Sequence, residues 1–380
     1  MAGLYLHVPF CARRCIYCDF YFVTSPPTAS FTRAMEAEIE AYGRQYGPKE
    51  PIETIYFGGG TPSRLPLDDV ARLLAALHRH FDTAAVAEVT FEANPEDVTP
   101  EYLAGLKTLG VTRLSLGVQS FFDEDLRWMN RAHDAAQAEA AVEAVAAAGF
   151  SSFSLDLIFG LPEQPFEHWG ANLEKALRLG APHLSTYSLT VEEQTSLGKQ
   201  VALGRVVPAG DTTLRERFLF TMEYLETRGL RQYEVSSFAR PGAESNHNSA
   251  YWAHRNYLGF GPSAHSFWKT TRSKAERWAN VRHLGRYEGL LAGGHLPLDT
   301  REPLGPDALA EEAILLGLRR LDTGLDLATL ERDYGVDLLA EKPAELAALE
   351  AAGLIHSVTD RVRLTREGAC VADAVALKLV

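Results

Sequence analysis

This sequence is poor in the features that mark secreted, membrane-spanning and nucleic-acid-binding proteins. It holds only four cysteines in 380 residues, too few and too unevenly placed for a disulfide framework. Basic residues number 37 against 50 acidic ones, and the net charge of −13 argues against a phosphate backbone as a partner. No apolar run approaches the ~20 residues that cross a bilayer, and the N-terminus shows no secretory signal. We therefore expect a cytoplasmic protein with no membrane span and no nucleic-acid partner.

Short apolar runs alternate with helical patterns over the first half of the chain. The runs are rich in Val, Ile, Phe, Tyr and Leu, and the segments between them carry apolar residues at helical spacing. The expected strands span residues 4–10, 54–60, 88–95, 113–120, 152–160 and 183–191. This series predicts an α/β fold with a parallel sheet, either an open doubly wound sheet or a full or partial barrel.

Polar or conformationally special residues stand at the ends of these expected strands. They are Cys11, the run Gly58-Gly59-Gly60-Thr61, Glu92, Asn94, Gln119, Asp156, Tyr187, Ser188 and Thr190. The carboxyl ends of parallel strands form the active-site face of such folds. We therefore expect these residues to surround one mouth of the sheet.

Three of the four cysteines fall within eight residues, in the segment CARRCIYC. Their spacing is C-x3-C-x2-C, with Cys11, Cys15 and Cys18, whereas Cys370 is distant. A structural zinc site needs a fourth ligand, and a two-cluster ferredoxin repeats its cysteines. Three cysteines on a four-iron cluster would leave one iron for an outside ligand. On the residues alone, a zinc or redox site remains the alternative.

The segment CARRCIYC resembles the cysteine loop of the radical S-adenosylmethionine (SAM) superfamily. This resemblance implies a [4Fe-4S] cluster whose open iron is chelated by SAM, a full or partial (β/α) barrel, and an electron donor as a partner. The segment GGGTP at 58–62 is similar to the glycine motif of the same superfamily. Glycine suits that role because it lets the backbone approach the methionyl end of SAM closely.

Other segments resemble the coproporphyrinogen-oxidase-like branch of this superfamily over nearly the whole chain. They are LYLHVPFC, FGGGTP, FEANP, RLSLGVQSF, LDLIFGLP and LGFGPSAHS. The resemblance implies that Tyr5 hydrogen-bonds near the cluster-bound SAM and that Tyr17 lies beside its adenine. It also implies that SAM contacts Gly59, Gly60, Thr61, Glu92, Gln119, Arg131 and Asp156. On the residues alone, Arg131 could instead pair with a surface acid and Gln119 could cap a helix.

Two functions compete within this branch: the oxygen-independent coproporphyrinogen III oxidase, which is a radical SAM decarboxylase, and the HemW-type heme chaperone. The oxidases carry a fourth cysteine two places after the third, where this chain has Phe20. They also have a longer segment before the cluster, whereas ten residues precede Cys11 here. The segment HNSAYW at 247–252 matches the HNxxYW motif of the chaperones. The resemblance therefore favours the chaperone, and a purely structural iron–sulfur protein ranks last because it would need no glycine motif.

The HNxxYW segment is chemically suited to heme. Imidazole is a common axial ligand of heme iron, and Tyr251 and Trp252 offer flat apolar faces to a porphyrin. His247 is the first candidate ligand and His265 the second; the alternative is a packed loop in which His247 satisfies a backbone carbonyl. The expected partners are heme and heme-accepting proteins, and the sequence leaves a homodimer open.

The alternation of strands and helices breaks after about residue 205. A single strand is predicted over 231–239, and the following residues are dense in Asn, His, Gly and aromatics, which indicates loops. Near the C-terminus, helices precede a hairpin-like segment at 354–365, as in winged-helix domains. A last helix follows it and contains Cys370, which we expect to be a small buried side chain. We expect a partial (β/α)6 barrel of the TIM type over 1–235, a loop-rich extension over 236–304, and a small C-terminal α+β, winged-helix-like domain over 305–380.

Overall fold

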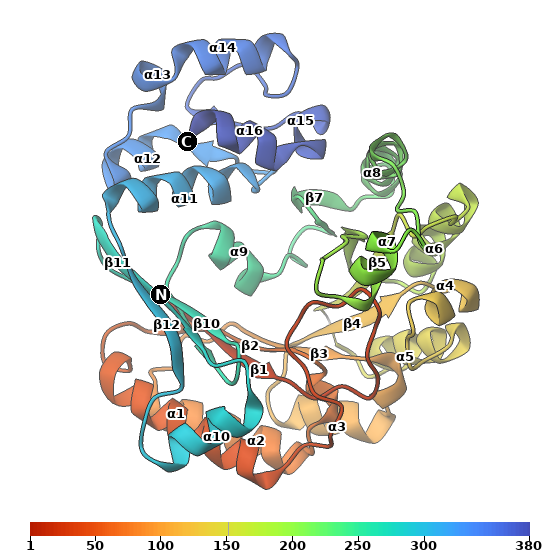
Figure 1. Ribbon diagram of the computed structural model, residues 1–380, viewed down its shortest axis with the longest axis vertical. Coiled ribbons are helices and arrows are strands. Elements are labelled where there is room, and N and C mark those ends of the chain that lie inside the picture. Colours follow the sequence, from red (N-terminus) through yellow and green to blue (C-terminus); the bar gives the residue numbers. More distant parts are fainter. Residues whose placement is uncertain (151) are drawn as a thin grey trace.

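Six parallel strands form the centre of the molecule. The structure is a computed structural model that describes residues 1–150 and 152–380 (Figure 1). The strands are β1 (Ala2–Val8), β2 (Ile52–Gly59), β3 (Glu88–Ala93), β4 (Arg113–Gln119), β5 (Ser152–Phe159) and β6 (His183–Ser188). Each pairs in parallel with the next in chain order. The predicted α/β fold with a parallel sheet is confirmed, with all six strands where the sequence indicated them.

Helices connect these strands and cover the outer face of the sheet (Figure 1). They are α1 (Ala29–Tyr46), α2 (Leu67–His80), α3 (Pro100–Thr108), α4 (Asp123–Trp128), α5 (Ala135–Ala147) and α6 (Phe166–Arg178). Side chains fix where they begin: the Thr28 hydroxyl accepts a hydrogen bond from the Phe31 amide at α1, and Asp134 and Gln137 form a capping box at α5. The short helices α3 and α4 were not predicted, because nine and six residues hardly reveal a helical period.

The barrel core lies between the strands and these helices. Leu6, Phe57, Phe91, Leu114 and Leu155, from β1 to β5 in turn, have no exposed surface. In a strand, alternate side chains point to opposite faces, so the residues between these are free to face the interior of the curved sheet. The helical layer therefore anchors each strand, and the inner face is left for chemistry.

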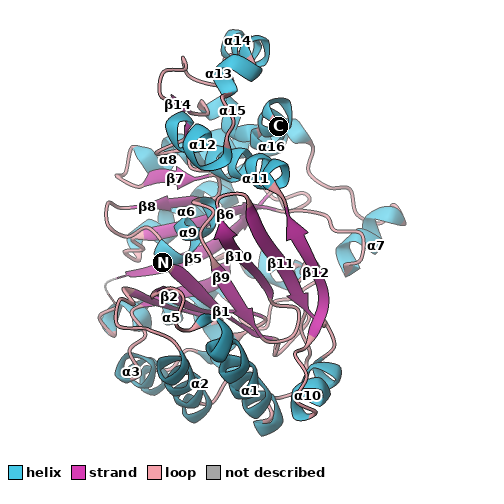
Figure 2. Ribbon diagram, turned by 90° about the vertical axis from the view of Figure 1, so that its left-hand side faces the viewer, coloured by secondary structure: helices cyan, strands magenta, loops and turns pink. Residues whose placement is uncertain are grey.

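Further strands extend the sheet on both sides to a total of twelve (Figure 2). They are β7 (Arg231–Glu234), β8 (Ser237–Ala239), β9 (Tyr257–Phe260), β10 (His265–Thr271), β11 (Lys274–Asn280) and β12 (Leu298–Leu304). The order is β12-β11-β10-β9-β1-β2-β3-β4-β5-β6-β8-β7, and within the described residues no pairing joins its two ends. The barrel is therefore partial, as predicted.

The segment 236–304 differs from the loop-rich extension that we expected. It holds β8 to β12 together with α9 (Asn246–Trp252) and α10 (Leu284–Ala292), and β9 pairs in parallel with β1. Gly242, Gly261, Gly293 and Gly294 lie in turns or bends, whereas Phe267, Trp268 and Trp278 are buried in strands. The sequence misled here because the turn residues are frequent and the antiparallel strands between them are short.

The region between β6 and the extension also departs from the sequence pattern. Helices α7 (Ser196–Ala202) and α8 (Asp211–Glu226) precede β7 and β8, which are two strands rather than the predicted single one. The turn between them is closed by Glu234, whose carboxylate accepts a hydrogen bond from the Ser236 amide at 3.1 Å. A two-residue turn of Val235 and Ser236 carries no glycine or proline to signal it.

The C-terminal unit has its own apolar core. It comprises α11 (Pro306–Leu318), β13 (Leu325–Asp326), α12 (Leu327–Tyr334), α13 (Leu338–Glu341), α14 (Pro343–Ala351), β14 (Arg361–Val362), α15 (Arg366–Cys370) and α16 (Ala372–Leu379). The predicted hairpin is present as an antiparallel bridge between Ile355 and Leu364. The predicted last helix is broken at Val371 into α15 and α16. Helix α9 lies between this unit and the sheet, in contact with β2, β3 and α11 (Figure 1).

Candidate functional site

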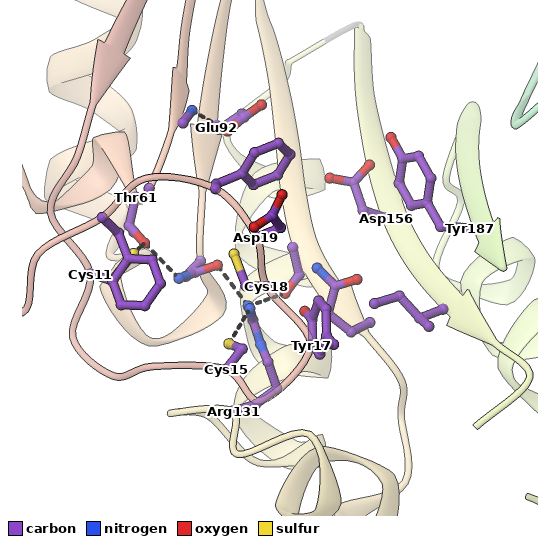
Figure 3. Close-up of a pocket in the computed structure, with 18 of the residues that line it drawn as sticks. Cys11, Cys15, Tyr17, Cys18, Asp19, Thr61, Glu92, Arg131, Asp156 and Tyr187 are labelled. Atoms are coloured by element: carbon purple, nitrogen blue, oxygen red, sulfur yellow. Dashed lines mark hydrogen bonds between the residues drawn. The ribbon is translucent and has the colours of Figure 1, made fainter. Parts of the chain in front are cut away.

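A cavity of about 540 Å³ opens at the carboxyl ends of the parallel strands (Figure 3). This is the edge at which the sequence predicted a mouth. Eleven of the predicted site residues line it: Cys11, Cys15, Tyr17, Cys18, Gly59, Gly60, Thr61, Glu92, Gln119, Arg131 and Asp156. We refer to it as the first cavity.

The cysteine loop enters the first cavity directly after β1. The Cys11 amide donates a hydrogen bond to the Val23 carbonyl at 2.9 Å, which ties the two ends of the loop together. The Thr61 hydroxyl lies 3.5 Å from the Cys11 sulfur, and an Arg131 guanidinium nitrogen lies 3.4 Å from the Cys15 sulfur (Figure 3). Burial raises the pKa of the Cys11 and Cys18 thiols to about 11, so a bound metal centre is needed to ionise them.

The three cysteine sulfurs do not meet at one point. Within the described part of the chain, no group of three or more His, Cys, Asp or Glu side chains is close enough to hold a single metal ion. A [4Fe-4S] cluster binds each cysteine through a different iron, so it does not require the sulfurs to converge. The three donors of this loop are all thiols, which are the ligands that iron–sulfur clusters prefer.

The glycine run after β2 forms a bare backbone surface beside the sulfurs. Gly59 adopts φ = 108°, a conformation that side chains disfavour. A Cβ on Gly60 would lie 2.9 Å from the Val8 carbonyl oxygen and 3.1 Å from the Cys11 sulfur. Only glycine leaves room at this point for a ligand to touch the backbone.

Two buried carboxyl groups face the first cavity from β3 and β5. Glu92 accepts hydrogen bonds from the Tyr56 hydroxyl at 2.7 Å and the Gly59 amide at 3.2 Å. Asp156 accepts one from the Ser115 hydroxyl at 3.1 Å. Burial raises the pKa of Glu92 to about 7 and that of Asp156 to about 6. Both groups can therefore exchange a proton near neutral pH.

Arg131 links the cysteine loop to the strand ends. It donates hydrogen bonds to the Asn94 side-chain oxygen and the Gly117 carbonyl, each at 2.7 Å. Its buried Nε has no hydrogen-bond partner among the described residues, so one donor remains for a ligand. Gln119 holds φ = 67°, a strained backbone conformation of the kind that clusters at functional sites.

Asn94 belongs to this site, although it is absent from the set of residues predicted to contact SAM. Its side-chain nitrogen donates a hydrogen bond to the Thr61 hydroxyl at 3.1 Å, and its side-chain oxygen accepts one from Arg131. The available signal was its place directly after β3, the same position that identified the other strand-end residues.

Tyr5 does not line the first cavity. Its hydroxyl lies 3.2 Å from Nδ1 of His7, and both side chains line a second cavity of about 530 Å³. This second cavity adjoins the first, because Asp19 and Phe20 line both. His265, the second candidate heme ligand, is exposed at the start of β10 and also lines the second cavity.

His247, the first candidate heme ligand, lies in the interior and lines neither cavity. It is 1% exposed, with Nδ1 2.7 Å from the Thr54 hydroxyl and Nε2 2.9 Å from the Tyr251 hydroxyl. A Cβ on Gly3 would lie 3.1 Å from its ring, so the ring packs tightly over β1. Burial lowers the pKa of His247 to about 3, which keeps it neutral. In this arrangement both of its ring nitrogens are engaged.

Two remaining features concern the chain as a whole. Cys370, which the pattern placed within a buried helix, is half-buried at the end of α15. Among the described residues, none of the helices combines the length and the apolar character that crossing a bilayer requires.

Comparison with known proteins agrees with the geometry of the first cavity. A model of the radical SAM superfamily matches residues 5–176, and a model of the HemN C-terminal domain matches residues 304–371. The chain is 38% identical to heme chaperone HemW of Mycobacterium tuberculosis, over all of this chain and 94% of that protein. It is 35% identical to heme chaperone HemW of Bacillus subtilis, over 99% and 98% of the two chains.

Among solved structures, coproporphyrinogen III oxidase (HemN) from Escherichia coli has the same fold. The TM-score is 0.83 at 23% identity, covering all of this chain and 89% of that one. Because the identity is low, this likeness shows the fold. The family is assigned by sequence similarity to the chaperones over the full chain. This chain belongs to the radical SAM superfamily and, within it, to the family of the HemW heme chaperones.

Proposed function

We propose that this protein binds a [4Fe-4S] cluster, SAM and heme, and delivers heme to heme-accepting proteins. The observation that carries the proposal is that three cysteines, a glycine run and two buried carboxyl groups line one cavity. They do so in a chain that matches proteins named as heme chaperones over its whole length. The sequence departure at Phe20 supports the same choice.

The residues of the first cavity fit the cluster and SAM. Cys11, Cys15 and Cys18 would hold the cluster, which supplies one-electron chemistry when bound and therefore calls for an electron donor as a partner. The close approach at Gly60 and the unpartnered Nε of Arg131 provide a surface and a donor for the methionyl part of SAM. Glu92 and Asp156 offer acceptors for its hydroxyl and amino groups.

The proposal excludes coproporphyrinogen decarboxylation as the main activity. The likeness to the oxidase is one of fold at 23% identity, whereas the chaperones are 35–38% identical. Phe20 supplies no thiol at the position where the oxidases have their fourth cysteine. Its side chain is 69% exposed and lies in the wall between the two cavities.

The experiment is anaerobic reconstitution followed by three measurements on one preparation. We expect about four irons and four sulfides per chain, as a [4Fe-4S] centre requires. SAM should change the electron paramagnetic resonance spectrum of the reduced cluster. The heme-loaded protein should pass heme to a heme-free acceptor faster than it releases heme to buffer. Zinc instead of iron, or a spectrum unchanged by SAM, would contradict the first half of the proposal; absence of heme binding would contradict the second.

A further inference from the structure

The second cavity has the properties of a binding site for a flat, anionic, iron-containing ligand. We propose that heme binds in this cavity, with His265 rather than His247 as its axial ligand and Arg282 as the partner of a propionate; this inference rests on the proposed function. The cavity lies between β1, the antiparallel extension and α9, and Leu316 of α11 closes it from the C-terminal unit.

The walls of the second cavity are mainly aromatic. Tyr5, Tyr251, Trp252, Tyr257 and Phe267 line it, from β1, α9, β9 and β10. Aromatic faces stack on a porphyrin and exclude water from it, and about 530 Å³ lies within the range of pockets for ligands of cofactor size. The first cavity, by contrast, is lined by thiols, glycines and carboxyl groups, which suit a polar ligand.

The hydrogen bonds of the nearby histidines single out His265. His7 is engaged through both nitrogens, with the Tyr21 carbonyl at 2.9 Å and the Tyr5 hydroxyl at 3.2 Å. His254 is hydrogen-bonded through Nδ1, 3.0 Å from the Tyr334 hydroxyl. Its Nε2 forms no hydrogen bond among the described residues, but it is buried and lies 3.3 Å from the Glu312 carboxylate.

The two candidate heme ligands, His247 and His265, differ in whether their ring nitrogens are already hydrogen-bonded. His247 is engaged with Thr54 and Tyr251, as described above. For His265, the hydrogen bonds of the described residues include none to the ring, and the side chain is exposed to the cavity. An iron atom could bind His265 without breaking any existing contact, whereas a bond to His247 would cost a buried hydrogen bond.

The three arginines of the second cavity are not equivalent. Arg255 pairs with Glu53, and Arg277 lies 2.7 Å from the Glu312 carboxylate. Arg282 has no carboxylate partner among the described residues and donates only to the Asp19 carbonyl, at 3.4 Å. A guanidinium without a carboxylate partner can bind a propionate carboxylate through two parallel hydrogen bonds.

Two residues beside this cavity have positive φ angles. His254 has φ = 53° and Ser263 has φ = 65°, both in the left-handed region that non-glycine residues avoid. Ser263 holds this conformation with its amide bonded to the Val281 carbonyl at 3.0 Å, next to Arg282. Strain of this kind persists where the surrounding fold fixes a functional geometry. The hydrogen bond between Ser263 and Val281 brings together the segments that carry His265 and Arg282.

Titration of ferric heme into the purified protein tests the ligand. We expect His265→Ala to weaken binding about tenfold or more and to shift the Soret absorption band, since an axial nitrogen is lost. Free imidazole should restore the wild-type spectrum in this variant. His356→Ala, at an exposed histidine of the C-terminal unit, is the matched control and should bind as the wild type does.

The same titration separates failure of the inference from failure of the proposed function. If wild-type protein binds no heme, the proposed function is wrong. If wild type binds heme and His265→Ala gives the same affinity and spectrum, the inference is wrong while the function stands. A spectral change in His247→Ala, with an unaltered circular dichroism spectrum and no change in His265→Ala, would return the ligand to the HNxxYW segment.

The dimethyl ester of heme, which lacks propionate charges, tests Arg282. We expect Arg282→Gln to bind heme severalfold more weakly than wild type but to bind the ester equally well. Arg286→Gln, on the exposed side of α10, should match wild type with both ligands. An equal loss of heme and ester affinity in Arg282→Gln would show that Arg282 acts on the cavity's shape rather than on a propionate, and would overturn its assignment.

Discussion

The two cavities are similar in volume, about 540 and 530 Å³, and share the wall formed by Asp19 and Phe20, yet their linings differ in kind. The first gathers thiols, glycines and buried carboxyl groups at the ends of parallel strands. The second gathers aromatic rings, arginines and an unengaged histidine from β1 and the antiparallel extension. This difference supports our proposal that one partial barrel carries a redox centre and a cargo site on separate ligand sets. Each set should therefore be removable without the other.

Removal of a cysteine is the strongest test of this separation. We expect Cys15→Ala to abolish the iron–sulfur cluster completely, because two thiols in this loop cannot hold a cubane. Heme affinity should remain within about twofold of wild type. Iron and sulfide analysis together with heme titration measures both effects. Cys370→Ala, at the end of α15, is the control and should keep the full cluster. Loss of heme binding along with the cluster would show that the two cavities form one site.

The second-largest effect is expected on the affinity for SAM, when a side chain fills the space beside Gly60. In Gly60→Val the new side chain would press on the Val8 carbonyl and occupy the space beside the Cys11 sulfur. We expect SAM affinity to fall at least about tenfold, which is ~1.4 kcal/mol, in samples matched for iron content. Equilibrium binding of labelled SAM provides the measurement. Gly289→Val is the control, since a Cβ there meets nothing within 4 Å. Equal SAM affinity in Gly60→Val and wild type would show that SAM does not bind against this glycine surface.

The carboxyl groups of the first cavity should make SAM binding depend on pH. With pKa values of about 7 for Glu92 and about 6 for Asp156, both are largely protonated below about pH 5 and largely ionised above about pH 8. The sulfonium charge of SAM favours the ionised forms, so affinity should rise with pH, by up to about tenfold, and then level off. Glu92→Gln should show a smaller rise, centred at lower pH. A wild-type affinity independent of pH would contradict this role.

The smallest effect is expected at the shared wall. Phe20→Ala should weaken heme binding about two- to fourfold, because a side chain that is 69% exposed contributes only part of its surface to a ligand. Cluster content should not change, since Phe20 supplies no ligand. Parallel heme titration and iron analysis test this. A change in cluster content with heme binding intact would mean that Phe20 supports the cysteine loop instead.

The first cavity could be predicted from the sequence because its residues come in short contiguous motifs at strand ends. Cys11 follows β1, Gly60 follows β2, and Glu92 and Asp156 lie within strands that the apolar runs marked. The parallel arrangement then brings these ends together whatever the details of the helices. Asn94 follows β3 within the segment FEANP, yet it was not among the predicted SAM contacts, because the hydrogen bonds that join it to Thr61 and Arg131 depend on long-range packing.

The second cavity could not be predicted in the same way. Its residues come from β1, α9 and the strands β9 to β11, and the latter were expected to be loops. Tyr5 lines the second cavity together with residues of β9 and β10, and β9 pairs with β1 on the side opposite β2. Nothing local to β1 reveals that second neighbour. The burial of His247 depends likewise on long-range packing, over Gly3 and against Thr54, that the HNxxYW pattern does not encode.

The claim that this protein carries heme rather than decarboxylating coproporphyrinogen III is tested most directly on one cluster-loaded, anaerobic sample divided in two. One half receives heme; the other receives coproporphyrinogen III, SAM and a reductant. The account predicts saturable binding of about one heme per chain in the first half and no protoporphyrinogen in the second. Steady formation of protoporphyrinogen, with no heme bound, would contradict it.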